Sequence, residues 1–237
     1  MVNTRNPLNL GAAARAMSNF GFFDLRVVNP YEASFREARS AVGAPEVLAK
    51  AREYESVAAA VADCALVVGT TSAARRELQH PLYRLDQAGK LIRKQLGTAR
   101  AALLFGSEKR GLSNEDLSHC HWLLRIPTRE EHGSMNLGQA VAVCLYELAR
   151  ERAEALPVRR SKKSEREAAT AARSAELERI TTTLLDALRA SGYLDLKPST
   201  AANEKIRRMV RRLKLSAEDS KLLLGMLRQL LWKMGRK

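Results

Sequence analysis

The stretch "RIPTREEHGSMNLGQAVAVCLYEL" (residues 125–148) changes character twice along its length. An apolar segment ends at Ile126, a polar loop follows, and a helix rich in small apolar residues begins near Asn136. Gly133, Ser134 and Asn136 could present backbone groups and a hydroxyl to a ligand at the start of that helix. An ordinary loop between a strand and a helix explains the same residues, so this stretch alone leaves both interpretations open.

Working outward, apolar runs of strand length alternate with helix-like segments from the N-terminus to about residue 156. This order is typical of an α/β domain whose sheet is mostly parallel. The runs that we predict as strands are Leu25–Val28, Arg52–Glu55, Ala65–Val68, Ala101–Phe105 and Trp122–Ile126.

The character of the chain changes after Pro157, where charged residues and alanine replace the large apolar side chains. Beyond this point the sequence shows helical periodicity and no strand pattern. The predicted helices are Leu177–Ala190, Ala202–Leu213 and Ala217–Met234. We therefore expect a first domain over residues 1–156, a basic linker over 157–175 and a small helical bundle over 176–237.

The positive charge is concentrated in the last third of the chain. The formal net charge is +14, and residues 157–237 hold 20 lysines and arginines against 9 acidic residues. Such a segment favours a polyanionic partner, because neutralised phosphates release counterions and so strengthen binding. We expect a nucleic acid; a basic, solvated surface that maintains solubility is the alternative.

Several classes of protein do not fit the sequence. The apolar runs are far shorter than the ~20 residues of a membrane helix, and no signal peptide is recognisable, so we expect a cytoplasmic protein without a membrane partner. Three widely spaced cysteines, Cys64, Cys120 and Cys144, do not make a disulfide framework. The "HCH" at residues 119–121 has no further ligands at zinc-site spacing, so we expect no metal.

Two other strands run into loops rich in Gly, Ser and Thr: "VVGTTSAARR" (residues 67–76) and "LLFGSEKRGLSNEDL" (residues 103–117). Ligands of open parallel sheets lie at the carboxyl ends of strands, so these loops and the one after Ile126 could form one site. None of them has the glycine pattern of a dinucleotide site or of a P-loop.

A second "NLG" occurs near the N-terminus, in "NPLNLGAAARAM" (residues 6–17). We expect Asn9 and Gly11 to form a turn into a tightly packed alanine-rich helix, in which Arg15 is the charged side chain. A packed helix with a solvated arginine explains these residues equally well in isolation.

Taken together and in order, "NPLNLGAAARAM", "VVGTTSA", "LLFGSEKRGLSNEDL" and "IPTREEHGSMNLGQAVAVCLYEL" resemble the SPOUT superfamily of RNA methyltransferases, in the branch that methylates ribose 2′-hydroxyls. The resemblance spans nearly all of residues 3–150. The tail segments "LLDALRASGYLDLKPS", "EKIRRMVRRLKLS" and "DSKLLLGMLRQLLWKM" resemble the C-terminal extension of its tRNA cytidine/uridine-2′-O-methyltransferases.

The resemblance implies an α/β fold with a trefoil knot, a parallel sheet with helices on both faces and a small C-terminal helical domain. It implies S-adenosyl-L-methionine as the cofactor and a homodimer whose active site is completed across the interface. It also implies that the basic extension binds tRNA, so we expect no DNA partner. In this family an apolar strand precedes the first motif, and here only Met1 and Val2 correspond to it: either the start codon is placed late, or the sheet lacks a central strand.

Site residues follow from the positions that match the family's motifs. The expected cofactor-binding residues are Thr71, Ser72, Ala73, Gly106, Ile126, Gly133, Ser134 and Met135. The expected catalytic residues are Arg15, Asn9, Glu108, Ser134 and Asn136.

The identity of the proton acceptor stays open. A guanidinium remains protonated in proteins, so we expect Arg15 to hold a phosphate or to stabilise the developing alkoxide rather than to act as a base. His132 titrates in the right range and is a second candidate base.

The function predicted from these motifs is S-adenosyl-L-methionine-dependent methylation of a ribose 2′-hydroxyl in tRNA, at cytidine or uridine in the anticodon loop. The alternatives are methylation of rRNA or of another tRNA position, and a non-catalytic RNA-binding homologue.

Overall fold

Six parallel strands form the frame of the protein in a computed structural model that describes residues 1–31, 35–36, 46–72, 79–96, 99–129, 131, 133–150, 171–195 and 199–234. The strands are β1 (Arg26–Val28), β2 (Arg52–Tyr54), β3 (Leu66–Thr70), β4 (Leu82–Arg84), β5 (Ala101–Leu104) and β6 (Trp122–Arg125). One sheet pairs β1 with β2, and the other has the order β4-β6-β3-β5. The predicted α/β class with a parallel sheet is confirmed; the trefoil knot stays a prediction.

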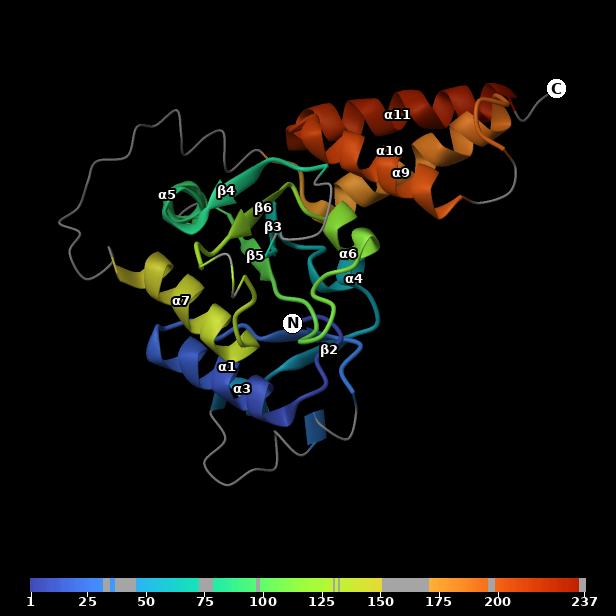
Figure 1. Ribbon diagram of the computed structural model, residues 1–237. Coiled ribbons are helices and arrows are strands. Elements are labelled where there is room, and N and C mark those ends of the chain that lie inside the picture. Colours follow the sequence, from blue (N-terminus) through green and yellow to red (C-terminus); the bar gives the residue numbers. More distant parts are fainter. Residues whose placement is uncertain are drawn as a thin grey trace.

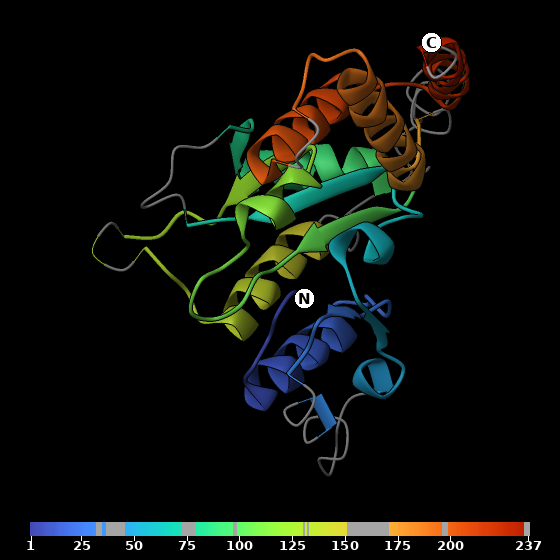
Figure 2. The same ribbon diagram turned by 90° about the vertical axis from the view of Figure 1, so that its right-hand side faces the viewer.

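Helices cover both faces of the four-stranded sheet (Figures 1 and 2). The first part of the chain contains α1 (Pro7–Asn19), α3 (Glu46–Ala49), α4 (Val57–Ala60), α5 (Leu85–Leu96), α6 (Asn114–Ser118) and α7 (Leu137–Ala149). The C-terminal part contains α9 (Ser174–Ala190), α10 (Thr200–Arg212) and α11 (Ala217–Met234). None of the helices in the described ranges is long and apolar enough to cross a bilayer.

Alternate residues of the central strands supply two separate cores. Val68 and Leu124 join the larger core beneath α1, α5 and α7, whereas Val67 and Leu123 join a second core beneath α4 and α6. Successive side chains of a strand point to opposite faces, which is why continuous apolar runs were needed in β3 and β6.

The five strands predicted from the sequence are all present, each within two residues of its expected bounds at either end. β4 was not among the strands predicted from the sequence. β4 has three residues, of which two are exposed and one is half-buried. It pairs with β6 at the edge of the sheet, so it lacks the apolar pattern of a buried strand.

Residues 1–3 lie between the two sheets. The Val2 amide donates to the Phe105 carbonyl over 2.8 Å, and the Val28 amide donates to the Met1 carbonyl over 2.8 Å. A single parallel bridge joins Val2 to Val28. This short segment therefore links β1 to the end of β5.

A mostly apolar cavity of about 450 Å³ lies beside this segment, between β1 and β5. The Met1 amine is enclosed beside it and donates to the Arg26 carbonyl over 2.7 Å. Burial lowers the pKa of this amine to about 5.

The C-terminal helices pack against the α4 and α6 side of the sheet, opposite α1 and α7 (Figure 2). The backbone amide and the hydroxyl of Ser174 both donate to the Cys64 carbonyl over 2.9 Å. From α10, the Arg207 guanidinium donates to the Ser118 hydroxyl over 3.1 Å and to the Glu178 carboxylate over 3.1 Å. Arg211 lies 3.5 Å from the same carboxylate, and only 2% of its side chain is exposed.

Two buried histidines near these arginines predict sensitivity to acid. Burial and the positive charges of Arg207 and Arg211 lower the pKa of His119 to about 3, and burial and Arg211 lower that of His121 to about 3. Below the ordinary value of 6.5 the unfolded chain binds protons at both imidazoles, whereas the folded chain does not until near pH 3. The free energy of unfolding should therefore fall as the pH drops through this window, by up to ~1.4 kcal/mol for each pKa unit of difference.

Urea unfolding at pH 7 and pH 5 measures this effect. We expect a large drop in the midpoint for the native chain and a smaller one for His119→Gln, which carries one titrating group fewer. An equal drop in both proteins would contradict the assignment.

Candidate active site

A pocket of about 770 Å³ lies at the carboxyl ends of β3, β5 and β6, beside the starts of α1 and α7. These three strands are adjacent and parallel, so the loops that follow them meet at one edge of the sheet. Its lining combines apolar side chains with hydroxyls, two carboxylates and backbone groups. The polar or glycine residues of the lining are Asn9, Thr70, Thr71, Ser72, Gly106, Ser107, Glu108, Lys109, Arg110, Gly111, Thr128, Glu131, Gly133, Ser134 and Asn136.

The loop after β5 folds tightly back on itself over Gly106. A Cβ at Gly106 would lie 2.0 Å from the backbone carbon of Gly111, which leaves no room for a side chain. The Gly111 amide donates to the Ser107 carbonyl over 2.8 Å, and Gly111 has a φ of +67°, which favours glycine. The turn places Glu108 at the pocket, where its carboxylate lies next to the start of α1.

Glu108, Asn9 and Asn136 form a chain of hydrogen bonds across the pocket. The Asn136 side-chain amide donates to Asn9 Oδ1 over 2.9 Å, and the Asn9 amide donates to Glu108 Oε1 over 3.1 Å. The backbone amides of Arg5 and Asn6 also donate to the Glu108 carboxylate, over 3.3 and 3.2 Å. The carboxylate thus ties together the starts of two helices and the loop after β5.

These bonds determine the charge of Glu108. Partial burial would raise its pKa, but the hydrogen bonds from the Asn9 side chain and from the backbone amides of Arg5 and Asn6 lower it below the usual range. The carboxylate is therefore ionised at neutral pH, with its oxygens already accepting. It is suited to holding the site in place and poorly suited to taking a proton from a substrate.

The loop after β6 closes the other side of the pocket. The Thr128 hydroxyl donates to the Gly133 carbonyl over 3.4 Å, which draws the two ends of the loop together. Asn136 is the N-cap of α7, and its Oδ1 accepts from the Gln139 amide over 3.2 Å. The start of α7 thereby faces the pocket with its backbone amides, where partial positive charge accumulates.

The two "NLG" segments differ in what their glycines do. A Cβ at Gly138 would lie 2.7 Å from the Ala12 side chain, so this glycine permits α7 to cross α1 closely. Nothing lies within 4 Å of the corresponding position at Gly11. The two segments are two different helix starts that meet at one pocket.

Most of the predicted site residues meet at this pocket. From the cofactor group these are Thr71, Ser72, Gly106, Ile126, Gly133, Ser134 and Met135, and from the catalytic group they are Asn9, Glu108, Ser134 and Asn136. Ala73 and the candidate base His132 lie outside the described residues. Arg15 is exposed on α1 and does not line the pocket of its own chain.

One local expectation was wrong. Asn9 does not form a turn; it lies inside α1, which begins at Pro7 and is capped by the side chain of Asn6. Proline is favoured in the first turn of a helix, where its missing amide hydrogen is not needed.

Sequence reasoning also missed lining residues, namely Thr70, Lys109, Arg110, Thr128 and Glu131. All five lie in or directly beside the loops that the motifs had marked. The signal that could have found them is their position at strand ends rather than a pattern of their own.

The comparison with known proteins bears on this site and on the fold. Residues 1–146 match the SpoU rRNA Methylase family. The tRNA (cytidine/uridine-2′-O-)-methyltransferase TrmJ of Sodalis glossinidius (strain morsitans) is 32% identical over 96% of this chain and 88% of its own length. The protein of the same name from Yersinia pestis (strain Pestoides F) is 34% identical, with the same coverage.

A solved structure agrees with these relatives. The crystal structure of TrmJ from Z. mobilis superposes with a TM-score of 0.80 at 31% identity and covers 97% of this chain and 96% of that one. That likeness extends over the C-terminal helices as well as the sheet. From the match over residues 1–146 and the relatives that span nearly the whole chain, we conclude that the protein belongs to the SpoU rRNA Methylase family.

Proposed function

We propose that this protein transfers a methyl group from S-adenosyl-L-methionine to a ribose 2′-hydroxyl of tRNA, at cytidine or uridine in the anticodon loop. The observation that carries the proposal is the single pocket in which the residues expected to hold the cofactor meet Asn9, Glu108 and Asn136. The relatives named for this reaction match 96% of the chain, which includes the basic extension. The enzyme acts in the cytoplasm, where its substrate is found.

The pocket fits the cofactor in size and in chemistry. Its volume falls within the range of small-molecule sites, roughly 300–1,000 Å³. Hydroxyls of Thr71 and Ser72 and backbone groups of Gly133 to Met135 offer hydrogen bonds, while Leu124 and Ile126 offer an apolar surface for a base. When bound, the cofactor supplies an electrophilic methyl group on a sulfonium.

The chain's own residues position the acceptor ribose. Glu108 and Asn9 hold the start of α1 against the loop after β5, so that the side facing RNA keeps a fixed distance from the side facing the cofactor. Holding two reacting groups in line can supply several kcal/mol of the barrier, so a strong base is not required for most of the acceleration. Arg15 stabilises the negative charge that develops on the 2′-oxygen, or holds the adjacent phosphate.

We also propose a homodimer formed by the outer faces of α1 and α7. Leu8, Val143 and Tyr146 are 78%, 37% and 57% exposed on these two helices, which pack side by side (Figure 1). Arg15 is exposed on α1 beside this surface. A two-fold axis through it brings Arg15 of one protomer to the pocket of its partner, which explains why Arg15 lies outside its own pocket.

The C-terminal helices α9, α10 and α11 are proposed as the tRNA-binding extension. Not all of their charge is available to RNA: Arg207 and Arg211 face inward and pair with Glu178. The cations that remain exposed on and after α10 are Lys205, Arg212 and Lys214, and those on α11 are Lys221, Arg228 and Lys233. Arg173, just before α9, and Arg179, on α9, are also exposed, and exposed cations of this kind can release counterions from phosphates.

A methyl-transfer assay with radiolabelled donor tests the proposal. We expect incorporation into unmodified tRNA transcripts, little into rRNA fragments, and none into a tRNA whose anticodon-loop cytidines and uridines are replaced by 2′-deoxynucleotides. The family description names rRNA, which makes rRNA methylation the second candidate. Incorporation into rRNA alone would favour that candidate, and a folded protein that binds the donor but methylates neither RNA would favour a non-catalytic role.

A further inference from the structure

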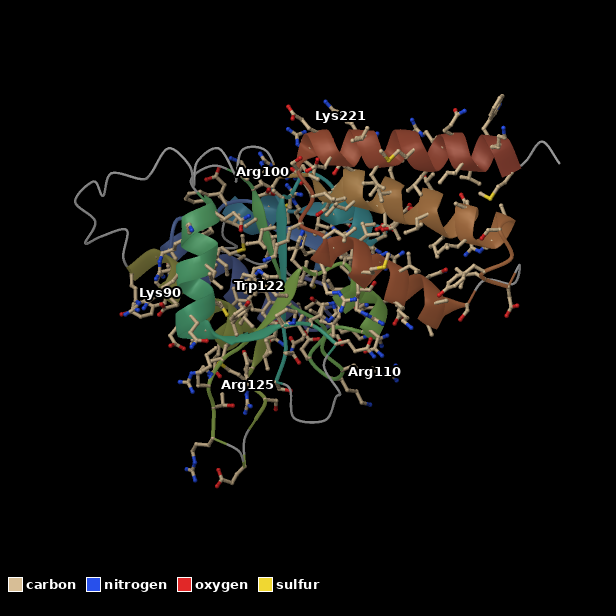
Figure 3. All side chains as sticks on the ribbon, turned by 90° about the horizontal axis from the view of Figure 1, so that it is seen from above. Lys90, Arg100, Arg110, Trp122, Arg125 and Lys221 are labelled. Atoms are coloured by element: carbon tan, nitrogen blue, oxygen red, sulfur yellow. The ribbon has the colours of Figure 1, made fainter. Side chains whose placement is uncertain are left out.

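Helix α11 leaves an apolar face uncovered. It packs inward on α9 through Leu227, which is 7% exposed. On the outward side Leu222 and Met226 are 61% and 53% exposed, and Leu230, at the border between this side and the packed side, is 56% exposed. α11 lies along the outer edge of the C-terminal helices (Figure 1), and its side chains project into open space beyond Lys221 (Figure 3). A solvated helix face normally carries polar residues at these positions.

A glycine interrupts the same face. Gly225 lies in the middle of α11 with an ordinary helical φ, and nothing lies within 4 Å of the place that a Cβ would take there. Glycine within a helix costs roughly 0.5–1 kcal/mol relative to alanine. Nothing in the described part of this chain requires that cost, whereas close approach of a second helix would.

The face is complementary to itself. Glu218, Leu222, Gln229 and Lys233 lie along one line of the helix, because they are spaced by four, seven and four residues. If a second α11 runs antiparallel, centred between Gly225 and Met226, then Glu218 lies level with Lys233 of the second copy. Leu222 then lies level with Gln229.

At the centre of such a pair, each Met226 lies beside Met226 of the second copy on one flank. Each Gly225 lies beside Gly225 of the second copy on the other flank. Acidic ends meet basic ends, and the small residues let the two backbones approach. We propose that α11 pairs antiparallel with α11 of a second copy of this chain.

The expected pair is small. A helix of 18 residues is ~27 Å long, and one helix face per copy is less than the ~800 Å² per partner of a standard interface. Pairing should therefore depend on concentration. It is separate from the proposed dimer surface on α1 and α7 and does not rest on the proposed function, since an inactive chain would pair equally well.

Disulfide trapping tests the proposal on the full chain. The native cysteines Cys64, Cys120 and Cys144 are buried, and burial raises the pKa of each thiol to about 12, so they will not react. Met226→Cys should give mostly cross-linked dimer under mild oxidation. Leu222→Cys, which is equally exposed, should give several-fold less, because the two copies of residue 222 lie ~10 Å apart along the helices.

A charge exchange provides the second arm. In the Met226→Cys background, Lys233→Glu should lower the yield of cross-linked dimer several-fold, since it sets like charges against each other. Adding Glu218→Lys should restore it. Equal cross-linking of Met226→Cys and Leu222→Cys, or failure of the exchange to restore the yield, would overturn the proposal. The proposal would also be overturned if Met226→Cys cross-links weakly and Met226→Glu lowers the affinity for tRNA. That result would assign this face to RNA.

Discussion

Arg15→Ala should lower the rate of methyl transfer to tRNA by about 10²- to 10³-fold while leaving the affinity for the methyl donor unchanged. Arg15 lies outside the pocket of its own chain, so its loss cannot disturb the residues that line the cofactor site. Arg15→Lys keeps the positive charge but loses the paired donors of the guanidinium, so most of the activity should still be lost. Single-turnover rates and calorimetry with the donor measure the two effects.

A mixed dimer decides whether Arg15 acts in the pocket of the partner. Gly106→Ala is the complementary variant, because its Cβ would collide with the loop that lines the cofactor pocket. If the two inactive variants are co-expressed, mixed dimers contain one pocket with an intact cofactor site and an intact Arg15 from the other subunit. Random assembly should then restore about a quarter of the native activity. A mixture as inactive as its parents would place Arg15 in its own subunit's reaction or show that no dimer forms.

Glu178→Ala should lower the free energy of unfolding by about 3 kcal/mol, the low end of the effect of breaking a buried ion pair. The carboxylate lies 3.1 Å from Arg207 and 3.5 Å from Arg211, whose side chains are 16% and 2% exposed. Two buried guanidiniums would remain without their counter-charge. Partial exposure of Glu178, at 24%, keeps the effect below that of a fully buried pair.

Glu46→Ala is the matched control for this prediction, because Glu46 pairs with Lys50 at the exposed end of α3. Exposed pairs contribute little, so its unfolding midpoint in urea should not change. The Glu178 variant should also bind tRNA more weakly while binding the methyl donor normally, since the C-terminal helices are held to α6 by this cluster. Equal midpoints for the two variants would show that the cluster does not hold the helices in place.

The sequence predicted β3, β5 and β6 because they are continuous apolar runs. β3 and β6 contribute to cores on both faces of the sheet. The residues that point to either face therefore had to be apolar. β4 has no such requirement, because it lies at an edge and its residues are largely exposed. A strand formed mainly by backbone pairing carries no pattern from which to predict it.

The candidate site was predictable in its loops and not in its contacts. Motifs placed Asn9, Glu108 and Asn136 at one site, but nothing in their spacing shows that the carboxylate accepts hydrogen bonds from Asn9 and two backbone amides rather than a proton. Charge counting likewise overstated the surface available to RNA. Arg207 and Arg211 read as free cations in a basic run, although they are turned toward Glu178 by the helix packing.

The crossing of α1 and α7 has a thermodynamic consequence. Gly138 lets the two helices touch at Ala12 without an intervening side chain, and Asn136 joins Asn9 by a hydrogen bond at the same end. The part proposed to face RNA and the part proposed to face the cofactor are therefore joined directly at this end. If one ligand orders this region, the second ligand binds a region that is already ordered, and its binding costs less conformational entropy. Affinity for the donor and affinity for tRNA are then coupled, and each raises the other by the same factor.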